Sequence, residues 1–151
     1  MVLDDSTPRR LLISDEGKEA VFVFLGTSVT KLFDLAWAGP IAVDSLNRIV
    51  ATARYSNWAS LFAPDGTPLT RYFAPTKESS PLARGPGDRF WGSDIYAVNS
   101  SNQLIRVDAN GSATIMGSGF QQVTCLQFGP DNALYLAERN TGRIYRITKN
   151  P

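Results

Sequence analysis

Histidine is absent from the 151-residue sequence, and this absence excludes several classes of site. Serine–histidine and cysteine–histidine catalysis, histidine general bases and zinc sites built on imidazole all need this side chain. The single cysteine, Cys125, excludes an internal disulfide. Its apolar neighbours predict a small buried hydrophobic residue rather than a reactive thiol.

Long apolar runs and an excess of one charge are missing as well. No run approaches the ~20 apolar residues that span a bilayer, so we expect no membrane insertion. The first residues have neither the basic nor the apolar region of a signal peptide, and the compartment stays unknown. The net charge of +1 gives no reason to expect nucleic acid as a partner.

A strand pattern recurs along the chain. Four segments rich in β-branched or aromatic residues can be aligned with one another. The aligned residues Leu12, Val50, Tyr96 and Tyr135 are separated by 38, 46 and 39 residues. A second strand follows each segment, at 21–24, 59–62, 104–107 and 144–147. Two independent strands therefore keep nearly the same period.

Further strands complete each unit. We expect a third strand at 30–35, 69–73 and 113–116, and opening strands at 39–44 and 123–128, with an irregular opener within 88–92. Asp65-Gly66 and Asn110-Gly111 predict two-residue hairpin turns. Four short antiparallel strands in about 40 residues are the content of a propeller blade. We predict an all-β fold, a β-propeller fragment of about four four-stranded antiparallel blades in one domain, approximately at 1–37, 38–75, 82–118 and 119–151.

The two ends of the chain add to this prediction. Residues 2–5 are similar to the tail of an opening strand, and the last unit stops after three strands, so the last blade should lack its outer strand. The chain is expected to be the C-terminal four blades of a longer propeller, or a unit that completes itself by association. An open blade edge invites pairing, which makes a homodimer through open blade edges one expected assembly.

The antiparallel strand order sorts the connections into two ends of the propeller. Connections between first and second strands, and between third and fourth strands, lie together at what we call the turn end. Its compact Asp, Asn and Gly turns serve backbone geometry. Connections between second and third strands, and those that join blades, form the opposite loop end. These loops are longer, and long loops on a rigid scaffold are where sites usually lie.

The loop end supplies the candidate ligand-binding residues. Aromatic and arginine side chains there suit an interaction surface, although a tryptophan at a blade junction, such as Trp37 or Trp91, can also simply pack between blades. The candidates are Trp37, Arg54, Tyr55, Asn57, Trp58, Arg89, Asn99, Gln121, Glu138 and Arg139. No catalytic residue is predicted.

Carboxylates at the loop end offer a metal site as a further hypothesis. Ca²⁺ prefers six to eight oxygen ligands, and two or three acids converging near the propeller axis could supply some of them. The acids are Glu16, Glu19, Asp88, Asp94 and Glu138. The alternative is that each is a solvated loop acid.

The stretch 128–147, FGPDNALYLAERNTGRIYRI, resembles the repeats of six-bladed propellers in the NHL-repeat proteins and the senescence marker protein/gluconolactonase-like superfamily. Segments 39–44 and 104–111 are similar to the same signature. Members bind proteins, RNA or sugars, or catalyse hydrolysis, so the resemblance implies the fold and not the activity. The lactonase branch uses a central divalent cation, often calcium, held where opening strands enter the channel. Asp88 is the residue here that matches such a ligand, and no catalytic residue carries over.

Three functional readings follow. The sequence favours a binding or scaffold module that uses its loop end for a protein or small-molecule ligand. The alternative is a divalent-metal-dependent hydrolase of the gluconolactonase-like type, acting on a lactone or ester. The third is an incomplete fragment without independent activity.

Overall fold

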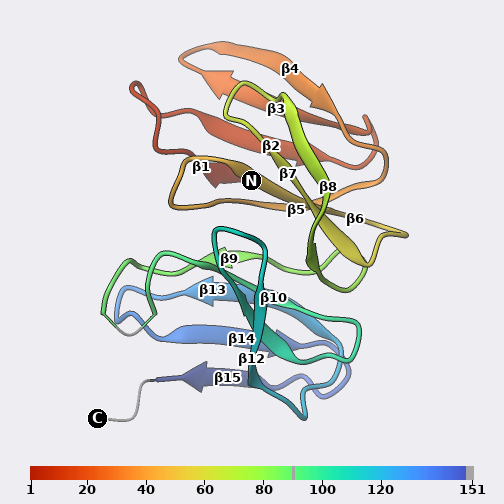
Figure 1. Ribbon diagram of the computed structural model, residues 1–151, viewed down its shortest axis with the longest axis vertical. Helices are drawn as coiled ribbons and strands as arrows, with labels where there is room; N and C mark the ends of the chain where they lie inside the picture. Colours follow the sequence, from red (N-terminus) through yellow and green to blue (C-terminus); the bar gives the residue numbers. More distant parts are fainter. Residues whose placement is uncertain (90, 149–151) are drawn as a thin grey trace.

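Four antiparallel sheets make up the computed structural model, which describes residues 1–89 and 91–148 (Figure 1). The first sheet has β1 (Val2–Leu3), β2 (Leu11–Asp15), β3 (Ala20–Leu25) and β4 (Ser28–Asp34). The second has β5 (Ala38–Val43), β6 (Ile49–Ala53), β7 (Trp58–Phe62) and β8 (Pro68–Pro75). The third has β9 (Ala83–Arg84), β10 (Ile95–Val98), β11 (Leu104–Val107) and β12 (Ala113–Gly117).

The fourth sheet has three strands, β13 (Val123–Phe128), β14 (Leu134–Glu138) and β15 (Ile144–Ile147). The sheets follow one another as the blades of a β-propeller arc, with the first two in the upper half of Figure 1 and the last two in the lower half. The all-β fold, the four blades and the missing outer strand of the last blade are therefore confirmed. The described residues contain no helix that could cross a membrane.

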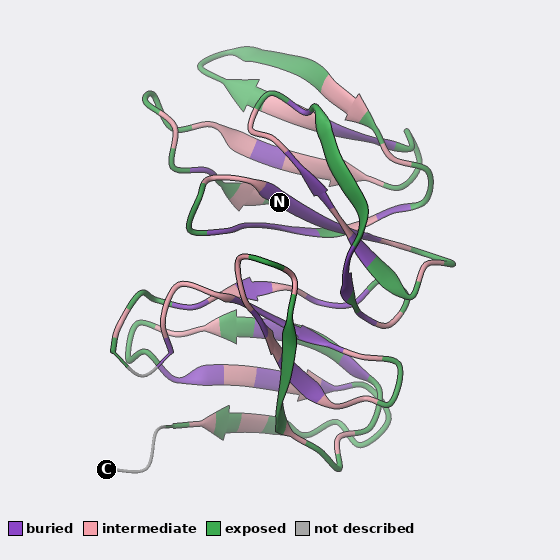
Figure 2. Ribbon diagram, in the orientation of Figure 1, coloured by how far each residue is buried: buried purple, intermediate pink, exposed green. Residues whose placement is uncertain are grey.

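The core lies between consecutive blades. Leu12 and Val21 of the first blade pack with Ile49 of the second. Val50 and Leu61 of the second blade pack with apolar residues of the third, and the other face of the third packs on the fourth. Figure 2 shows the consequence, because β10 is buried along its length whereas β4 is largely exposed. Each blade thus depends on its neighbours for burial of its apolar faces.

The opening strand of the third blade was predicted wrongly. It is the two-residue strand β9, whose Arg84 and Ala83 pair with Ile95 and Tyr96. The predicted segment 88–92 instead folds back on itself through a bridge between Asp88 and Gly92. Because this segment lies between a first and a second strand, it belongs to the turn end of the propeller.

The glycine turns are hairpins, but not of the predicted two-residue type. Gly66 and Gly111 have positive φ angles, +88° and +87°, whereas the preceding Asp65 and Asn110 do not. The N–H of Gly66 donates to the Ala63 carbonyl at 2.9 Å, and the N–H of Ala63 donates to the Thr67 carbonyl at 2.8 Å. The turn therefore spans five residues, as in a type I turn followed by a glycine bulge.

Cys125 was also predicted wrongly, since its side chain is exposed. The register between β13 and β14 shifts between Val123 and Cys125. This irregularity interrupts the alternation of faces, so Thr124 and Cys125 are both exposed while Val123 and Leu126 are buried.

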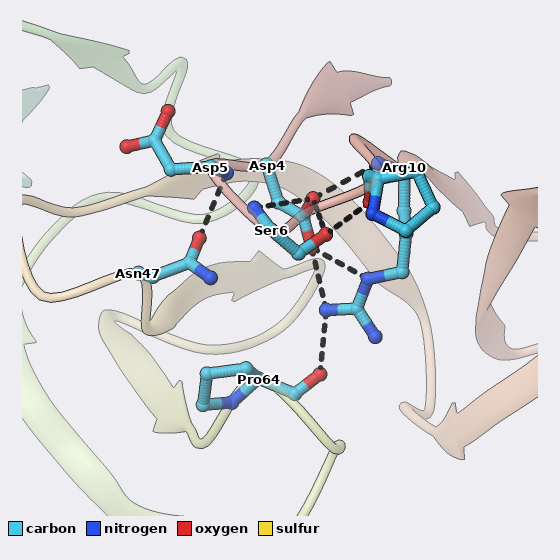
Figure 3. Close-up of polar contacts among 7 residues, drawn as sticks. Asp4, Asp5, Ser6, Arg10, Asn47 and Pro64 are labelled. Carbon is cyan, nitrogen blue, oxygen red and sulfur yellow. Dashed lines mark hydrogen bonds and ion pairs between the residues drawn. The ribbon is translucent and has the colours of Figure 1, made fainter.

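An aspartate–arginine pair fastens each of the first two blades to the next blade at the turn end. The Asp4 carboxylate accepts hydrogen bonds from Arg10 Nε at 2.7 Å and from the Ser6 hydroxyl, and Arg10 donates onward to the Pro64 carbonyl at 2.9 Å (Figure 3). Asp44 and Arg48 repeat the arrangement, with Arg48 donating to the Ala109 carbonyl at 2.7 Å. Burial acts to raise the pKa of Asp4, but the hydrogen bonds from Ser6 and Arg10 hold that pKa below its ordinary value.

Candidate functional site

A cavity of about 430 Å³ lies between the first and second blades and brings together three of the predicted site residues, Trp37, Arg54 and Tyr55. We call it the aromatic pocket. Its walls come from the connection between β4 and β5, the loop after β6, and strands β7 and β8. The residues that line it are Asp34, Leu35, Ala36, Trp37, Ala53, Arg54, Tyr55, Ser56, Ser60, Phe62, Pro68, Thr70 and Arg71.

Trp37 and Tyr55 form the aromatic edge of this pocket. Their rings meet edge to face, with centroids 5.4 Å apart, and the side chains are 45% and 63% exposed. Both residues have positive φ, 56° and 65°, a conformation that bulky residues rarely adopt and that often marks functional sites. The surrounding structure therefore presents two aromatic surfaces to solvent at the pocket.

The backbone around Trp37 repeats in the fourth blade with a different side chain. The N–H of Arg54 donates to the Trp37 carbonyl at 3.0 Å, and the N–H of Arg139 donates to the Gln122 carbonyl at 3.1 Å. Gln122 also has a positive φ, 46°. The left-handed conformation before the blade is thus part of the repeat, and what distinguishes the second blade is the aromatic side chain placed there.

The charges around the pocket are partly neutralised within the protein. The Arg54 guanidinium lies over the Tyr55 ring, 5.1 Å from its centroid, and pairs with Glu16 at 3.4 Å. Asp34 pairs with Lys31 at 2.9 Å. Arg71 lies over the Tyr72 ring at 5.8 Å, and no carboxylate of the described residues pairs with it.

Trp58 extends the aromatic surface next to the pocket. Its ring meets that of Tyr72 edge to face at 5.9 Å, and both side chains are exposed. Asn57 is exposed, and its carbonyl accepts a hydrogen bond from the Thr76 N–H at 2.9 Å. These two predicted residues follow the lining residue Ser56 in the sequence and do not line the pocket.

Sequence reasoning missed the residues that β7 and β8 contribute. Ser60, Thr70 and Arg71 line the pocket, although adjacent residues of a regular strand point to opposite faces. The register of β8 against β7 shifts between Ala59 and Leu61, and the Ser60 hydroxyl donates to the Arg71 carbonyl at 3.2 Å. Thr70 and Arg71 both line the pocket next to this irregularity, and the sequence carries no signal for it.

Other predicted residues serve the loops of their own blades. The Asn99 side chain accepts the N–H groups of Ser101 and Gln103, each at 3.0 Å. Buried Glu138 accepts the Gln121 N–H at 2.6 Å and the Thr141 hydroxyl. The hydrogen bond from Thr141 has the largest effect on the pKa of Glu138, and together with that from Gln121 it holds this pKa below its ordinary value. Gln121 and Arg139 are exposed in the same blade.

Asp88 and Arg89 do not lie at the loop end, where the sequence placed them. Both follow β9, so the strand order assigns them to the turn end. The Asp88 carboxylate accepts the Trp91 N–H at 2.7 Å, and Arg89 is exposed. Residues 1–89 and 91–148 contain no group of three or more carboxylate or cysteine side chains that could hold a metal ion.

A second cavity, of about 330 Å³, lies where the innermost strands of all four blades meet. Leu3, Val43, Arg84 and Gln127 are among the residues that line it. Arg84 pairs with Asp5 of the first blade, so its guanidinium is satisfied within the protein. At the loop end the long connection after β8 is packed rather than open: Lys77 Nζ donates to the Val123 carbonyl, and burial lowers the pKa of Lys77.

Comparison with known proteins defines the fold. No family model matches the sequence, and no curated protein matches it. Among solved structures, a streptogramin B lyase is 15% identical with a TM-score of 0.68, over 95% of this chain and 52% of that chain. A gluconolactonase-like protein is 12% identical with a TM-score of 0.66, over 92% of this chain and 56% of that chain.

A third similar structure is a catalytically inactive histidine-to-alanine variant of virginiamycin B lyase from Staphylococcus aureus, with quinupristin. It is 15% identical with a TM-score of 0.66, over 99% of this chain and 55% of that chain. The chain thus spans about half the length of each of these three structures. At these identities the likeness concerns the fold, and the fold of this chain is that of a four-blade arc of a β-propeller.

Proposed function

We propose that this chain is a non-catalytic binding module whose ligand occupies the aromatic pocket. The observation that supports this most is the pair of exposed aromatic residues, Trp37 and Tyr55, held in left-handed conformations beside a cavity of about 430 Å³. A cavity of this size is typical of small-molecule sites. Exposed aromatic side chains with a neighbouring arginine are typical of residues that dominate binding energy.

The contrast with Trp91 supports a binding role over a packing role. Trp91 is 2% exposed and packs edge to face against Tyr96 and Phe128 between the third and fourth blades. Trp37 leaves 45% of its surface exposed. A tryptophan needed solely to join blades would gain more from burial, since apolar burial contributes roughly 25 cal/mol per Å².

The hydrolase alternative has less support. The described residues offer no three-residue donor set for a divalent metal, and the ion pair of Arg84 with Asp5 neutralises charge at the central cavity. These observations support the binding proposal over the hydrolase alternative.

Ligand-observed NMR against a fragment set of sugars, lactones, short peptides and aromatic acids tests this proposal. Fragments that bind the wild type should lose saturation transfer in the Trp37→Ala/Tyr55→Ala double variant. Leu46→Ala is a control, because Leu46 is an exposed apolar residue that does not line the pocket. All variants should first show a wild-type melting profile.

A second pair of variants compares an arginine of the pocket with the arginine at the equivalent position of the fourth blade. Arg54→Ala should weaken fragment binding, whereas Arg139→Ala should not, because Arg139 has the same backbone hydrogen bond in the fourth blade without the aromatic neighbours. Fragment binding that is unchanged in the double variant, or equally weakened by both arginine replacements, would show that the pocket is not the binding site.

A further inference from the structure

The walls of the aromatic pocket define the chemistry of its ligand more closely. Its apolar surface comes from the rings of Trp37, Tyr55 and Phe62 with Pro68 and Leu35. Aromatic side chains favour flat rings in edge-to-face or offset arrangements. A planar ring matches these walls better than a flexible chain, because it loses little conformational freedom when it binds.

The charge of the pocket favours an anion. Arg54 is paired with Glu16 and Asp34 with Lys31, which leaves Arg71 as the lining charge without an ionic partner in residues 1–89 and 91–148. A guanidinium offers a planar fork of donors that matches a carboxylate in two-point contact. Arg71 lines the pocket next to the shifted register of β8, and its guanidinium lies over the neighbouring Tyr72 ring.

Hydroxyl groups beside Arg71 add neutral donors and acceptors. The Thr70 hydroxyl oxygen accepts the Tyr72 N–H at 3.4 Å, so its proton is free to be donated. The Ser60 hydroxyl donates to the Arg71 carbonyl at 3.2 Å and keeps lone pairs that can accept. Ser60, Thr70 and Arg71 thus supply polar groups from β7 and β8, whereas Trp37 and Tyr55 come from the connections before β5 and after β6.

We propose that the ligand of the aromatic pocket is a small aromatic carboxylate, with its ring against Trp37 and Tyr55 and its carboxylate bound by Arg71 and the Thr70 hydroxyl. This inference rests on the proposed function, since it names the ligand class of the same pocket. The volume of about 430 Å³ accommodates one or two fused rings with a short acidic side chain.

Calorimetric titration with three probes tests the ligand class. Indole-3-acetate carries the ring and the charge, indole-3-acetamide carries the ring with a neutral group of the same shape, and hexanoate carries the charge without a ring. Indole-3-acetate should bind about tenfold more tightly than the amide, which is the usual advantage of a charge-assisted bond. Hexanoate should bind more weakly than indole-3-acetate.

Variants assign the preference to named side chains. Arg71→Gln should abolish the difference between acid and amide, while Arg9→Gln, at an exposed arginine outside the pocket, should keep it. Trp37→Leu should weaken acid and amide by the same factor. Both arginines are exposed, so neither replacement threatens folding.

The outcomes separate this inference from the proposed function. Equal affinities for acid and amide, or a preference that survives in Arg71→Gln, overturn the ligand class but leave the pocket as the binding site if Trp37→Leu still weakens both. Absence of indole-3-acetate binding overturns the ligand class outright. The proposed function then depends on whether other fragments bind in a Trp37- and Tyr55-dependent way.

Discussion

Glu138 joins two loops of the fourth blade through its two carboxylate oxygens. One oxygen accepts the Gln121 N–H and the other accepts the Thr141 hydroxyl, and the side chain is buried. Hydrogen bonds to the charged form favour ionisation and lower the pKa. A loop acid that could have been a metal ligand therefore has a structural role.

The pH dependence of stability tests this role. Because the folded pKa of Glu138 lies below the unfolded value of ~4.3, its contribution is fully present above that unfolded value and is lost as the pH falls through the folded pKa. Glu138→Gln should lower Tm at about pH 7, and the difference from wild type should shrink towards about pH 3. Melting followed by circular dichroism measures both, with Glu78→Gln as an exposed control. A Tm difference independent of pH would contradict the role.

Residue identity predicted the aromatic part of the candidate site but not its limits. Trp37, Arg54 and Tyr55 were found because they follow recognisable strands at the loop end. Arg71 was not found, because it lines the pocket next to a strand irregularity that residue type does not signal. Exposure could not be read from sequence either, since Trp37 and Trp91 differ through the neighbouring blades that cover them.

At the level of strands and turns, two glycines in equivalent hairpins differ in their surroundings. Gly26 and Gly111 both have positive φ, 63° and 87°. A Cβ at Gly111 would lie 2.0 Å from the Phe73 carbonyl oxygen of the preceding blade, whereas a Cβ at Gly26 would meet nothing within 4 Å. The turn between the third and fourth strands of a blade thus requires glycine for its positive φ. When another blade precedes it, the turn also requires glycine because a Cβ would collide with that blade.

Alanine substitution separates these two reasons. Gly26→Ala should cost about 1–2 kcal/mol, the usual penalty of a left-handed conformation. Gly111→Ala should cost that amount and a further ~1–3 kcal/mol for the forced displacement of the neighbouring blade. Urea denaturation measures both. Equal losses would mean that the blades do not approach each other this closely.

The strands themselves were predicted well wherever they carry alternating β-branched and aromatic residues. β11, β13 and β15 have the predicted bounds. β9 was missed because it has two residues and lies between Pro81 and Pro86, so no periodicity can develop. The opening strand of the third blade is at 83–84 and not within 88–92. Asp88 and Arg89 therefore lie at the turn end and not at the predicted loop end.

At the scale of the whole molecule, the first blade exposes positions that are buried in the second. Ile49 and Phe62 of the second blade are 1% and 8% exposed because the first blade covers them. The equivalent residues of the first blade, 38 positions earlier, are Leu11 and Phe24. Phe24 is 37% exposed, Leu11 is half-buried, and Leu3, which pairs with Leu11, is 55% exposed. The outer face of the first blade therefore carries the side chains of a blade interface.

We expect this face, with the open edge of the last blade, to drive association with a second copy of the chain. Light scattering during size-exclusion chromatography should give about twice the chain mass at high protein concentration and the chain mass on dilution. Phe24→Lys should shift the equilibrium towards monomer, because a charge cannot be buried in an apolar interface without a partner. Ile115→Lys on β12, where Ile115 is 58% exposed, should not. A wild-type protein that stays monomeric throughout, or a Phe24→Lys variant that associates as the wild type does, would show that this face is not used.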